Sequence, residues 1–342
     1  MPLLLLVYAF MSPCGSGRPQ TKTGSADLAL RKAQQEFDRG DYQTAARAFE
    51  EVRRNAPERR EAWRGLILST LRNGEKEKAL SIARETAVRW PQDAEIRHLL
   101  GFVYFQTGNA EAAREELARA VGLEPNRYET HLDLALAYLS LQQYKSAAQE
   151  LDEVIRLRPE VPLPHILLGR ALQNTNRTLP AIREFQKALA LDSKVPLGHY
   201  HLGFAYQSLG RNAEAISEFR REMALHPDNA QVSFRLGVAL IDTGNRKDAA
   251  VQLRESLRLD PRNGEAQYAL AKALLELDQP EEAVFELTKA AALLPKDPRP
   301  YYLLARAYSK LKKAEEADKA LREFAELKKL QAASGGMAYR PN

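Results

Sequence analysis

Small and hydrophobic residues recur along this chain with a fixed period of 34 positions. Written in nine lines of 34, the chain has alanine at the twentieth position, here called column 20, of every line. The lines start at Ala26, Arg60, Ala94, Tyr128, Pro162, Pro196, Ala230, Gly264 and Pro298. Column 7 is leucine except at Lys32, column 8 is mostly glycine or alanine, and column 32 is mostly proline. A period of this length predicts a stack of similar supersecondary units and not one globular core.

Each line is expected to fold as two helices joined by a turn. Small residues at columns 8 and 20 allow the two helices to approach to about 8–10 Å. Glycine at column 15 (Gly40, Gly74, Gly108, Gly210 and Gly244) ends the first helix in a left-handed cap, which costs glycine least. Proline at column 32 stops the second helix, because the residue before it is pushed out of the helical region. Lines five and nine depart from this pattern with Ser193 and Lys329.

The combination of columns resembles the tetratricopeptide repeat family. Among the fullest matches are the sets Leu202-Gly203-Tyr206-Ala215-Phe219-Pro227 and Leu100-Gly101-Tyr104-Ala113-Leu117-Ala120-Pro125. The resemblance covers nine repeats and implies an all-α fold, a right-handed superhelical solenoid of 34-residue helix-turn-helix units. It also implies a concave wall formed by the first helices, with ligand-contacting side chains in columns 2, 5, 6, 9, 12 and 13.

The array divides the chain into three expected parts. Residues 1–25 are a hydrophobic leader and a flexible tether, residues 26–331 are the nine repeats, and residues 332–342 are a frayed tail. The last helix is expected to keep Ala317, Leu321 and Phe324 inward and to turn charged residues outward.

The leader carries a signal-like pattern. Leu3 to Met11 is an apolar run too short to span a bilayer, and small residues around Cys14 follow it. We expect an exported, periplasmic or membrane-tethered protein, with lipid attachment at Cys14 as one route to the membrane. The cytoplasmic alternative stays open, because no basic residue precedes the run and Pro13 stands before Cys14.

The charge of the chain does not indicate nucleic-acid binding. Fifty Lys and Arg residues are interleaved with 45 Asp and Glu residues, which leaves a formal net charge of +5. Arg53, Arg54, Arg59 and Arg60 form a local basic corner, interpreted as a solvated surface, with an acidic partner or phosphate as the alternative.

The motifs of common enzymes are absent from the sequence. There is no glycine-rich phosphate loop, His-Glu-x-x-His, Cys-x-x-Cys or Gly-x-Ser-x-Gly. His131, His165 and His199 share column 4, but neighbouring repeats lie about 10 Å apart, whereas zinc–nitrogen bonds are about 2 Å. We therefore expect packed histidines, no metal, no cofactor and no catalytic activity.

An aromatic ladder is the candidate binding feature. Column 5 of the last four repeats is aromatic, and cations stand nearby. The candidate groove residues are Tyr200, Phe204, Phe234, Arg235, Tyr268, Lys272, Tyr302 and Arg306. Aromatic side chains flanked by cations suit an extended or helical peptide with apolar and acidic residues. The alternative is that these aromatics only complete the core between repeats.

The sequence thus predicts a non-catalytic scaffold or adaptor that binds a protein or peptide segment in its concave groove. The alternative function is an accessory subunit of an enzyme, secretion or envelope complex that binds through the convex face.

Overall fold

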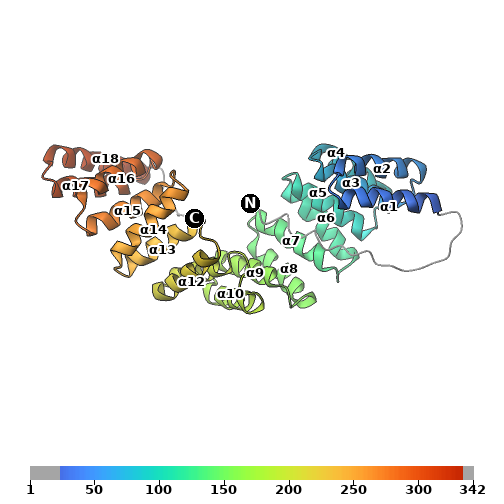
Figure 1. Ribbon diagram of the computed structural model, residues 1–342, viewed down its shortest axis with the longest axis horizontal. Helices are drawn as coiled ribbons and strands as arrows, with labels where there is room; N and C mark the ends of the chain where they lie inside the picture. Colours follow the sequence, from blue (N-terminus) through green and yellow to red (C-terminus); the bar gives the residue numbers. More distant parts are fainter. Residues whose placement is uncertain (1–23, 334–342) are drawn as a thin grey trace. The chain divides into compact units, whose positions relative to one another are not determined.

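The computed structural model describes residues 24–333, so the leader, Cys14 and the end of the tail lie outside the described part. These residues form eighteen α-helices and no strand (Figure 1). The prediction of an all-α helical repeat solenoid is confirmed. The chain divides after Leu141 into two compact units.

The two units contain the following helices. Unit 1 holds α1 (Gly24–Asp38), α2 (Tyr42–Asn55), α3 (Arg60–Arg72), α4 (Lys76–Arg89), α5 (Ala94–Gln106), α6 (Ala110–Leu123) and α7 (Tyr128–Ser140). Unit 2 holds α8 (Tyr144–Leu157), α9 (Pro162–Asn174), α10 (Thr178–Leu191), α11 (Gly198–Ser208), α12 (Asn212–Leu225), α13 (Ala230–Asp242), α14 (Arg246–Leu259), α15 (Gly264–Glu276), α16 (Pro280–Leu293), α17 (Arg299–Lys310) and α18 (Ala314–Ala333).

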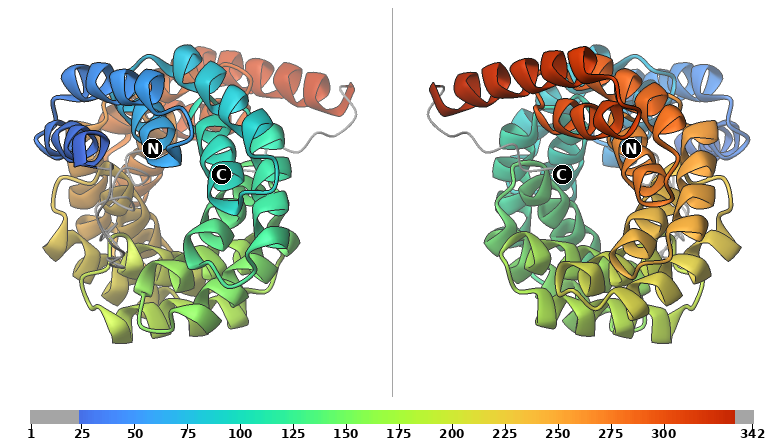
Figure 2. Two further views of the ribbon diagram at one scale, coloured as in Figure 1. Left: turned by 90° about the vertical axis from the view of Figure 1, so that its right-hand side faces the viewer. Right: turned by 90° about the vertical axis from the view of Figure 1, so that its left-hand side faces the viewer.

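Within each unit, every helix packs against the next one along the chain. The odd-numbered helices, which are the first helices of the repeats, also contact the next odd-numbered helix, as α3 contacts α5 and α13 contacts α15. We call the surface made by the odd-numbered helices the first-helix face and the opposite surface the second-helix face. Successive first helices therefore lie side by side within each unit (Figure 2).

The small residues of column 8 make room for a large buried side chain. A Cβ atom added to Gly203 would lie 2.8 Å from the ring of Phe219, and one added to Gly101 would lie 2.6 Å from Leu117. Phe219 and Leu117 occupy column 24 and are fully buried. Because real Cβ contacts are not this short, a larger residue at column 8 would force the two helices of the hairpin apart.

The turn between the two helices keeps one backbone conformation whatever its residue. The five glycines of column 15 have positive φ, between 72° and 86°. The remaining four column-15 residues, Gln142, Asn176, Asp278 and Lys312, also have positive φ, between 57° and 60°. The glycines in the sequence therefore predicted five of these turns, whereas the same left-handed conformation occurs in all nine repeats.

The exit of repeat five, where Ser193 replaces the usual proline, is irregular. Leu197 adopts a left-handed conformation with φ of 61°, and α11 begins only at Gly198. Three other first helices, α5, α13 and α15, are capped by a preceding side chain, from Asp93, Asn229 and Asn263. In α11 the fully buried carboxylate of Glu222 accepts a hydrogen bond of 3.2 Å from the backbone N–H of Tyr200 instead.

The two ends differ from the expected boundaries. Helix α1 includes Gly24 and Ser25, assigned above to the tether, and α18 continues through Ala332 and Ala333 of the expected tail. Helix α18 has 20 residues, whereas the second helix of each earlier repeat has 14. The prediction that Leu321 faces inward is wrong: its side chain is 45% exposed, because no further helix packs on that side of α18 within the described part of unit 2.

None of the helices described between residues 24 and 333 has both the length and the apolar character that a bilayer crossing requires.

Candidate functional site

The eight candidate groove residues all lie on first helices of unit 2. Tyr200 and Phe204 are on α11, Phe234 and Arg235 on α13, Tyr268 and Lys272 on α15, and Tyr302 and Arg306 on α17. Tyr302, Lys272 and Arg306 are exposed, whereas the other five are partly buried. The structure brings some of these residues into contact and keeps others apart.

Phe204, Phe234 and Arg235 form one cluster. The guanidinium carbon of Arg235 lies 4.6 Å from the ring centroid of Phe204 and 5.6 Å from that of Phe234. A cation within about 6 Å of an aromatic ring is attracted by the ring quadrupole. Arg235 therefore joins α11 to α13 and belongs to the packing between two repeats.

Tyr268 lies beside Arg299, an arginine that was not among the candidates predicted from the sequence. The guanidinium carbon of Arg299 is 5.0 Å from the ring centroid of Tyr268, and Arg299 pairs with both Glu265 and Asp297 at 2.5 Å. Burial raises the pKa of Tyr268, while the positive charges of Arg299 and Arg306 act in the opposite direction. The charge of Arg299 is thus already compensated by two carboxylates.

Tyr200 and Tyr302 each lean on an aromatic residue of a second helix. The ring centroids of Tyr200 and Phe219 are 6.1 Å apart, and those of Tyr302 and Phe324 are 5.5 Å apart. Tyr302 is nevertheless 47% exposed. The ladder residues therefore contact the repeat core on one side and keep some surface open on the other.

Lys272 and Arg306 occupy column 9 of two consecutive repeats. Both side chains are exposed, and within residues 24–333 neither forms an ion pair with a carboxylate. Lys310, one turn beyond Arg306, pairs with Asp278 at 2.6 Å. Lys272 and Arg306 are therefore cations of this face whose charge is available to a ligand.

His201 lies next to the ladder in a mainly apolar setting. Its ring stacks on Phe185 with centroids 5.6 Å apart and meets Tyr200 edge-on at 5.3 Å. Burial, assisted by the positive charge of Arg170, lowers the pKa of His201 to about 3. The imidazole is therefore neutral at physiological pH and adds no positive charge to the face.

The column-4 histidines have structural partners. The rings of His165 and His199 hydrogen-bond to Glu184 at 2.7 Å and to Glu218 at 2.6 Å, each within its own repeat. The ring of His131 hydrogen-bonds to the carbonyl oxygen of Pro125 at 2.9 Å. Across the part of the chain that the structure describes, no group of three or more His, Cys, Asp or Glu residues could hold a metal ion.

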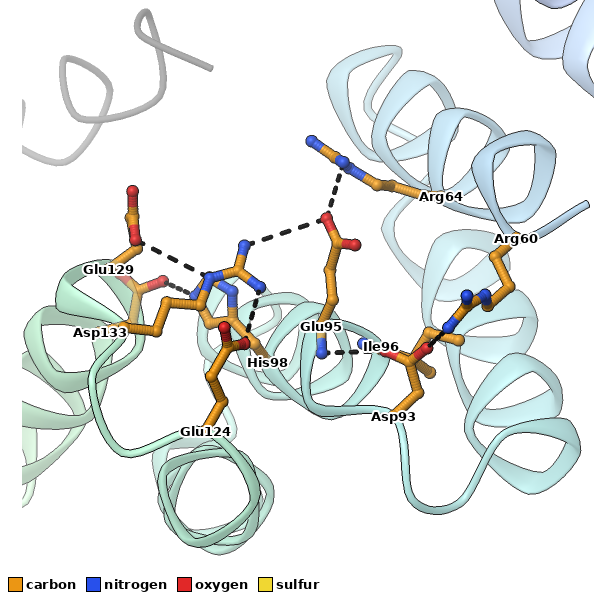
Figure 3. Close-up of polar contacts among 10 residues, drawn as sticks. Arg60, Arg64, Asp93, Glu95, Ile96, His98, Glu124, Glu129 and Asp133 are labelled. Carbon is orange, nitrogen blue, oxygen red and sulfur yellow. Dashed lines mark hydrogen bonds and ion pairs between the residues drawn. The ribbon is translucent and has the colours of Figure 1, made fainter. Parts of the chain in front are cut away.

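Unit 1 carries a different set of contacts on its first-helix face (Figure 3). Arg64 on α3 pairs with Glu95 on α5 at 2.6 Å, and Arg127 lies 3.9 Å from Glu95 and 3.8 Å from Glu129. Asp93 pairs with Arg60 and caps α5 by accepting hydrogen bonds from the backbone N–H groups of Glu95 and Ile96. These ion pairs link repeats two, three and four.

A buried pair lies beside this chain of ion pairs. The imidazole of His98 on α5 and the carboxylate of Asp133 on α7 are 2.7 Å apart, and both side chains are nearly inaccessible (Figure 3). These contacts were not predicted from the sequence. For the ion pairs, the available signal was opposite charges about one repeat length apart, as in Arg60 and Asp93, Arg64 and Glu95, and Glu95 and Arg127.

The fold and the first-helix face define a helical repeat protein, and comparisons with known proteins assign its family. Two family models described as tetratricopeptide repeat match residues 30–94, 166–230 and 200–253, and residues 104–171. A third, described as anaphase-promoting complex, cyclosome, subunit 3, matches residues 228–324. The chain belongs to the tetratricopeptide repeat family, as the sequence predicted.

Solved structures agree with this fold. A chain in the crystal structure of the APC/C hetero-tetramer Cut9-Hcn1 is 22% identical with a TM-score of 0.57; the match covers 84% of this chain and 57% of that chain. A tetratricopeptide repeat protein from Parabacteroides merdae ATCC 43184 is 16% identical with a TM-score of 0.54, and the match covers 73% and 99% of the two chains. No curated protein matches this sequence.

Proteins of this family bind protein or peptide partners and are generally non-catalytic scaffolds. The fold therefore indicates a scaffold for protein–protein interaction.

Proposed function

We propose that the first-helix face of unit 2 binds a peptide segment that carries acidic and apolar residues. The observation that carries this proposal is the pair Lys272 and Arg306, two exposed cations in the same column of consecutive repeats. Column positions of neighbouring repeats are separated by about one helix-packing distance, roughly 10 Å. Two acidic residues three positions apart in a polyproline II segment lie on one side of that segment and span a similar distance, at about 3.1 Å per residue.

The aromatic ladder supplies the apolar part of this face. Tyr268 and Tyr302 lie one turn before Lys272 and Arg306 on the same two helices, so a peptide side chain that contacts either ring stands next to a cation. Aromatic side chains offer a large contact area at a small entropic cost, which is why they are frequent hot spots. Arg235 contributes less free charge, because it is held between Phe204 and Phe234.

The double variant Lys272→Glu with Arg306→Glu tests the charge requirement. Partner proteins captured from a lysate by the full chain should be lost, and a peptide from the captured partner should bind at least about tenfold more weakly, with less salt dependence. The matched control is Arg183→Glu with Arg220→Glu, which reverses two exposed arginines on the second helices α10 and α12. Equal binding by the two double variants would contradict the proposal.

The double variant Phe234→Ala with Tyr268→Ala tests the aromatic requirement. If these rings contact the ligand, binding is lost, at about 2 kcal/mol or more per ring, while helicity is retained. Thermal melting by circular dichroism separates this result from a core role. If the rings mainly hold the repeats together, the variant melts early, since truncation of a buried Phe costs about 3–5 kcal/mol of folding stability.

A second candidate function uses the second-helix face of the same unit. Val251 on α14 and Phe285 on α16 occupy the same column of consecutive repeats and are 58% and 60% exposed. Exposed apolar side chains at one-repeat spacing favour an accessory subunit that packs a large partner on this side. Loss of the captured partner in a Val251→Asp, Phe285→Asp variant, with binding retained in Lys272→Glu, Arg306→Glu, would support this alternative.

A further inference from the structure

Helix α18 carries a row of six exposed residues along one side. Their spacing alternates between four and three positions, which keeps them in one line along a helix. The row consists of Ala314, Asp318, Leu321, Ala325, Lys328 and Ala332, and every member is exposed. We call this line of residues the α18 seam.

The columns of Asp318 and Leu321, in the middle of the seam, are buried in most of the preceding repeats. Ile182 on α10, Ile216 on α12 and Ala250 on α14, which correspond to Asp318, are 6%, 9% and 2% exposed. The next first helix packs against each of these second helices. In α18, which Figure 2 draws along its length, Asp318 is exposed and Leu321 is 45% exposed. The middle of the seam is therefore a helix-packing surface that has no partner in the described residues.

The residues of the seam are complementary to those of a second copy of the seam that runs in the opposite direction. When two copies of α18 lie antiparallel about a two-fold axis beside residue 323, Ala314 faces Ala332 and Leu321 faces Ala325 of the other copy. In the same register Asp318 faces Lys328. Every contact thus pairs small with small, large with small, or acid with base, and all six positions are satisfied by one register.

We propose that this chain forms a two-fold symmetric dimer through the α18 seam. An isologous interface requires one self-complementary patch, and the seam has this property in both size and charge. Alanine at three of the six positions allows the two helix axes to approach to the short end of the usual range of about 8–10 Å. The extra length of α18 beyond the 14 residues of other second helices supplies Lys328 and Ala332, which complete the register.

The simpler interpretation is that Asp318 and Lys328 only make the end of the array soluble, as terminal repeats of solenoids require. Solubility alone sets no relation between the two charges, whereas the dimer requires opposite signs at these two positions. The signs of residues 318 and 328 therefore separate the two interpretations.

The test is the molar mass of the full chain by light scattering and sedimentation velocity over a range of concentrations, with reductant present so that Cys14 cannot link two chains. We expect a concentration-dependent doubling of the molar mass. Asp318→Lys places like charges at two symmetric contacts and should raise the dimer dissociation constant by about tenfold. Glu323→Lys makes the same charge change at an exposed position off the seam of α18 and should leave the dimer unchanged.

The decisive variant is the charge swap Asp318→Lys with Lys328→Asp. It restores opposite charges in the antiparallel register, so its dissociation constant should return to within about threefold of wild type. Recovery is expected to be incomplete, because Lys328 also lies 5.6 Å from the ring centroid of Phe324 on its own helix. A monomer at all concentrations, a dimer indifferent to Asp318→Lys, or a folded swap variant that stays monomeric would each overturn the proposal.

Discussion

Unit 1 and unit 2 are built from the same repeat but carry different side chains at column 5, so their first-helix faces differ. In unit 1, Arg64 and His98 hold column 5, and each is bound to a carboxylate of the next repeat. In unit 2, the last four repeats place aromatic rings there, and exposed cations stand one turn after Tyr268 and Tyr302. The same helical hairpin accommodates either set of side chains at column 5, because the columns that form its core are the same in both units.

The first-helix face therefore differs in role between the two units: its side chains hold neighbouring repeats together in unit 1 and are proposed to bind a partner in unit 2. The charges on the first-helix face of unit 1 compensate one another between repeats, so a ligand would have to compete with existing ion pairs. The face of unit 2 keeps aromatic surface and two cations outside such pairs. Counting charged or aromatic residues does not distinguish the two units; the partners of each residue do.

The largest effect is expected when the core of one unit is damaged without the other. Phe219→Ala removes a fully buried ring of unit 2 that packs on Gly203, and it should cost about 3–5 kcal/mol. Trp63 and Trp90 are the only tryptophans and both lie in unit 1. The loss of helicity should therefore shift to lower temperature, while the tryptophan fluorescence transition shifts less.

Phe49→Ala is the matched variant in unit 1, since Phe49 is 2% exposed and packs on Gly65. It should shift the fluorescence transition directly. If both variants moved both signals equally, the two units would unfold as one body and their separation would be wrong.

The buried pair of unit 1 gives the next effect. Asp133→Ala removes the carboxylate 2.7 Å from the ring of His98, and the lost hydrogen bond to a buried charged group should cost about 1.5–3 kcal/mol. Denaturant unfolding followed by tryptophan fluorescence measures this change. A variant as stable as wild type would mean that His98 is satisfied by other groups and that this contact does not hold repeats three and four together.

The pH dependence of unit 2 tests the setting of His201. The pKa of His201 is about 3 in the folded protein and 6.5 in the unfolded chain. The contribution of neutral His201 to the free energy of unfolding is therefore fully present above pH 6.5. It decreases as the pH falls below 6.5, because the unfolded chain then takes up a proton that the folded protein does not. Between about pH 7 and pH 5, wild type should lose about 1–2 kcal/mol more than His201→Gln. Equal losses, measured by urea unfolding followed by circular dichroism, would show that this imidazole is open to water.

The smallest effect is expected from the outer ion pairs of unit 1. Arg127 lies between 3.8 and 3.9 Å from Glu95, Glu124 and Glu129, whose side chains are partly exposed. Arg127→Ala should cost less than about 1 kcal/mol, and added salt should reduce the difference from wild type. A loss of several kcal/mol would place this arginine among the core contacts of the array.

Much of the fold followed from the sequence, because small and large residues alternate in fixed columns with a direct steric meaning. Gly203 and Phe219 show this, since one leaves the space that the other fills. The partners of long side chains could not be predicted in the same way. Arg235 follows Phe234 in the sequence, yet only the rotamers show that it also lies over Phe204 on the preceding repeat. The exposure of Leu321 likewise depends on a neighbour that the column pattern does not reveal.

The left-handed turn at column 15 has a consequence for how such arrays can be assembled. Gln142, Asn176, Asp278 and Lys312 keep positive φ although an L-residue there costs roughly 1–2 kcal/mol. The packing of the hairpin, and not the identity of the turn residue, therefore fixes the path of the chain. A repeat taken from another array therefore needs helices of the same length but no particular residue at this turn. Repeats of this kind can be exchanged between arrays without changing the turn.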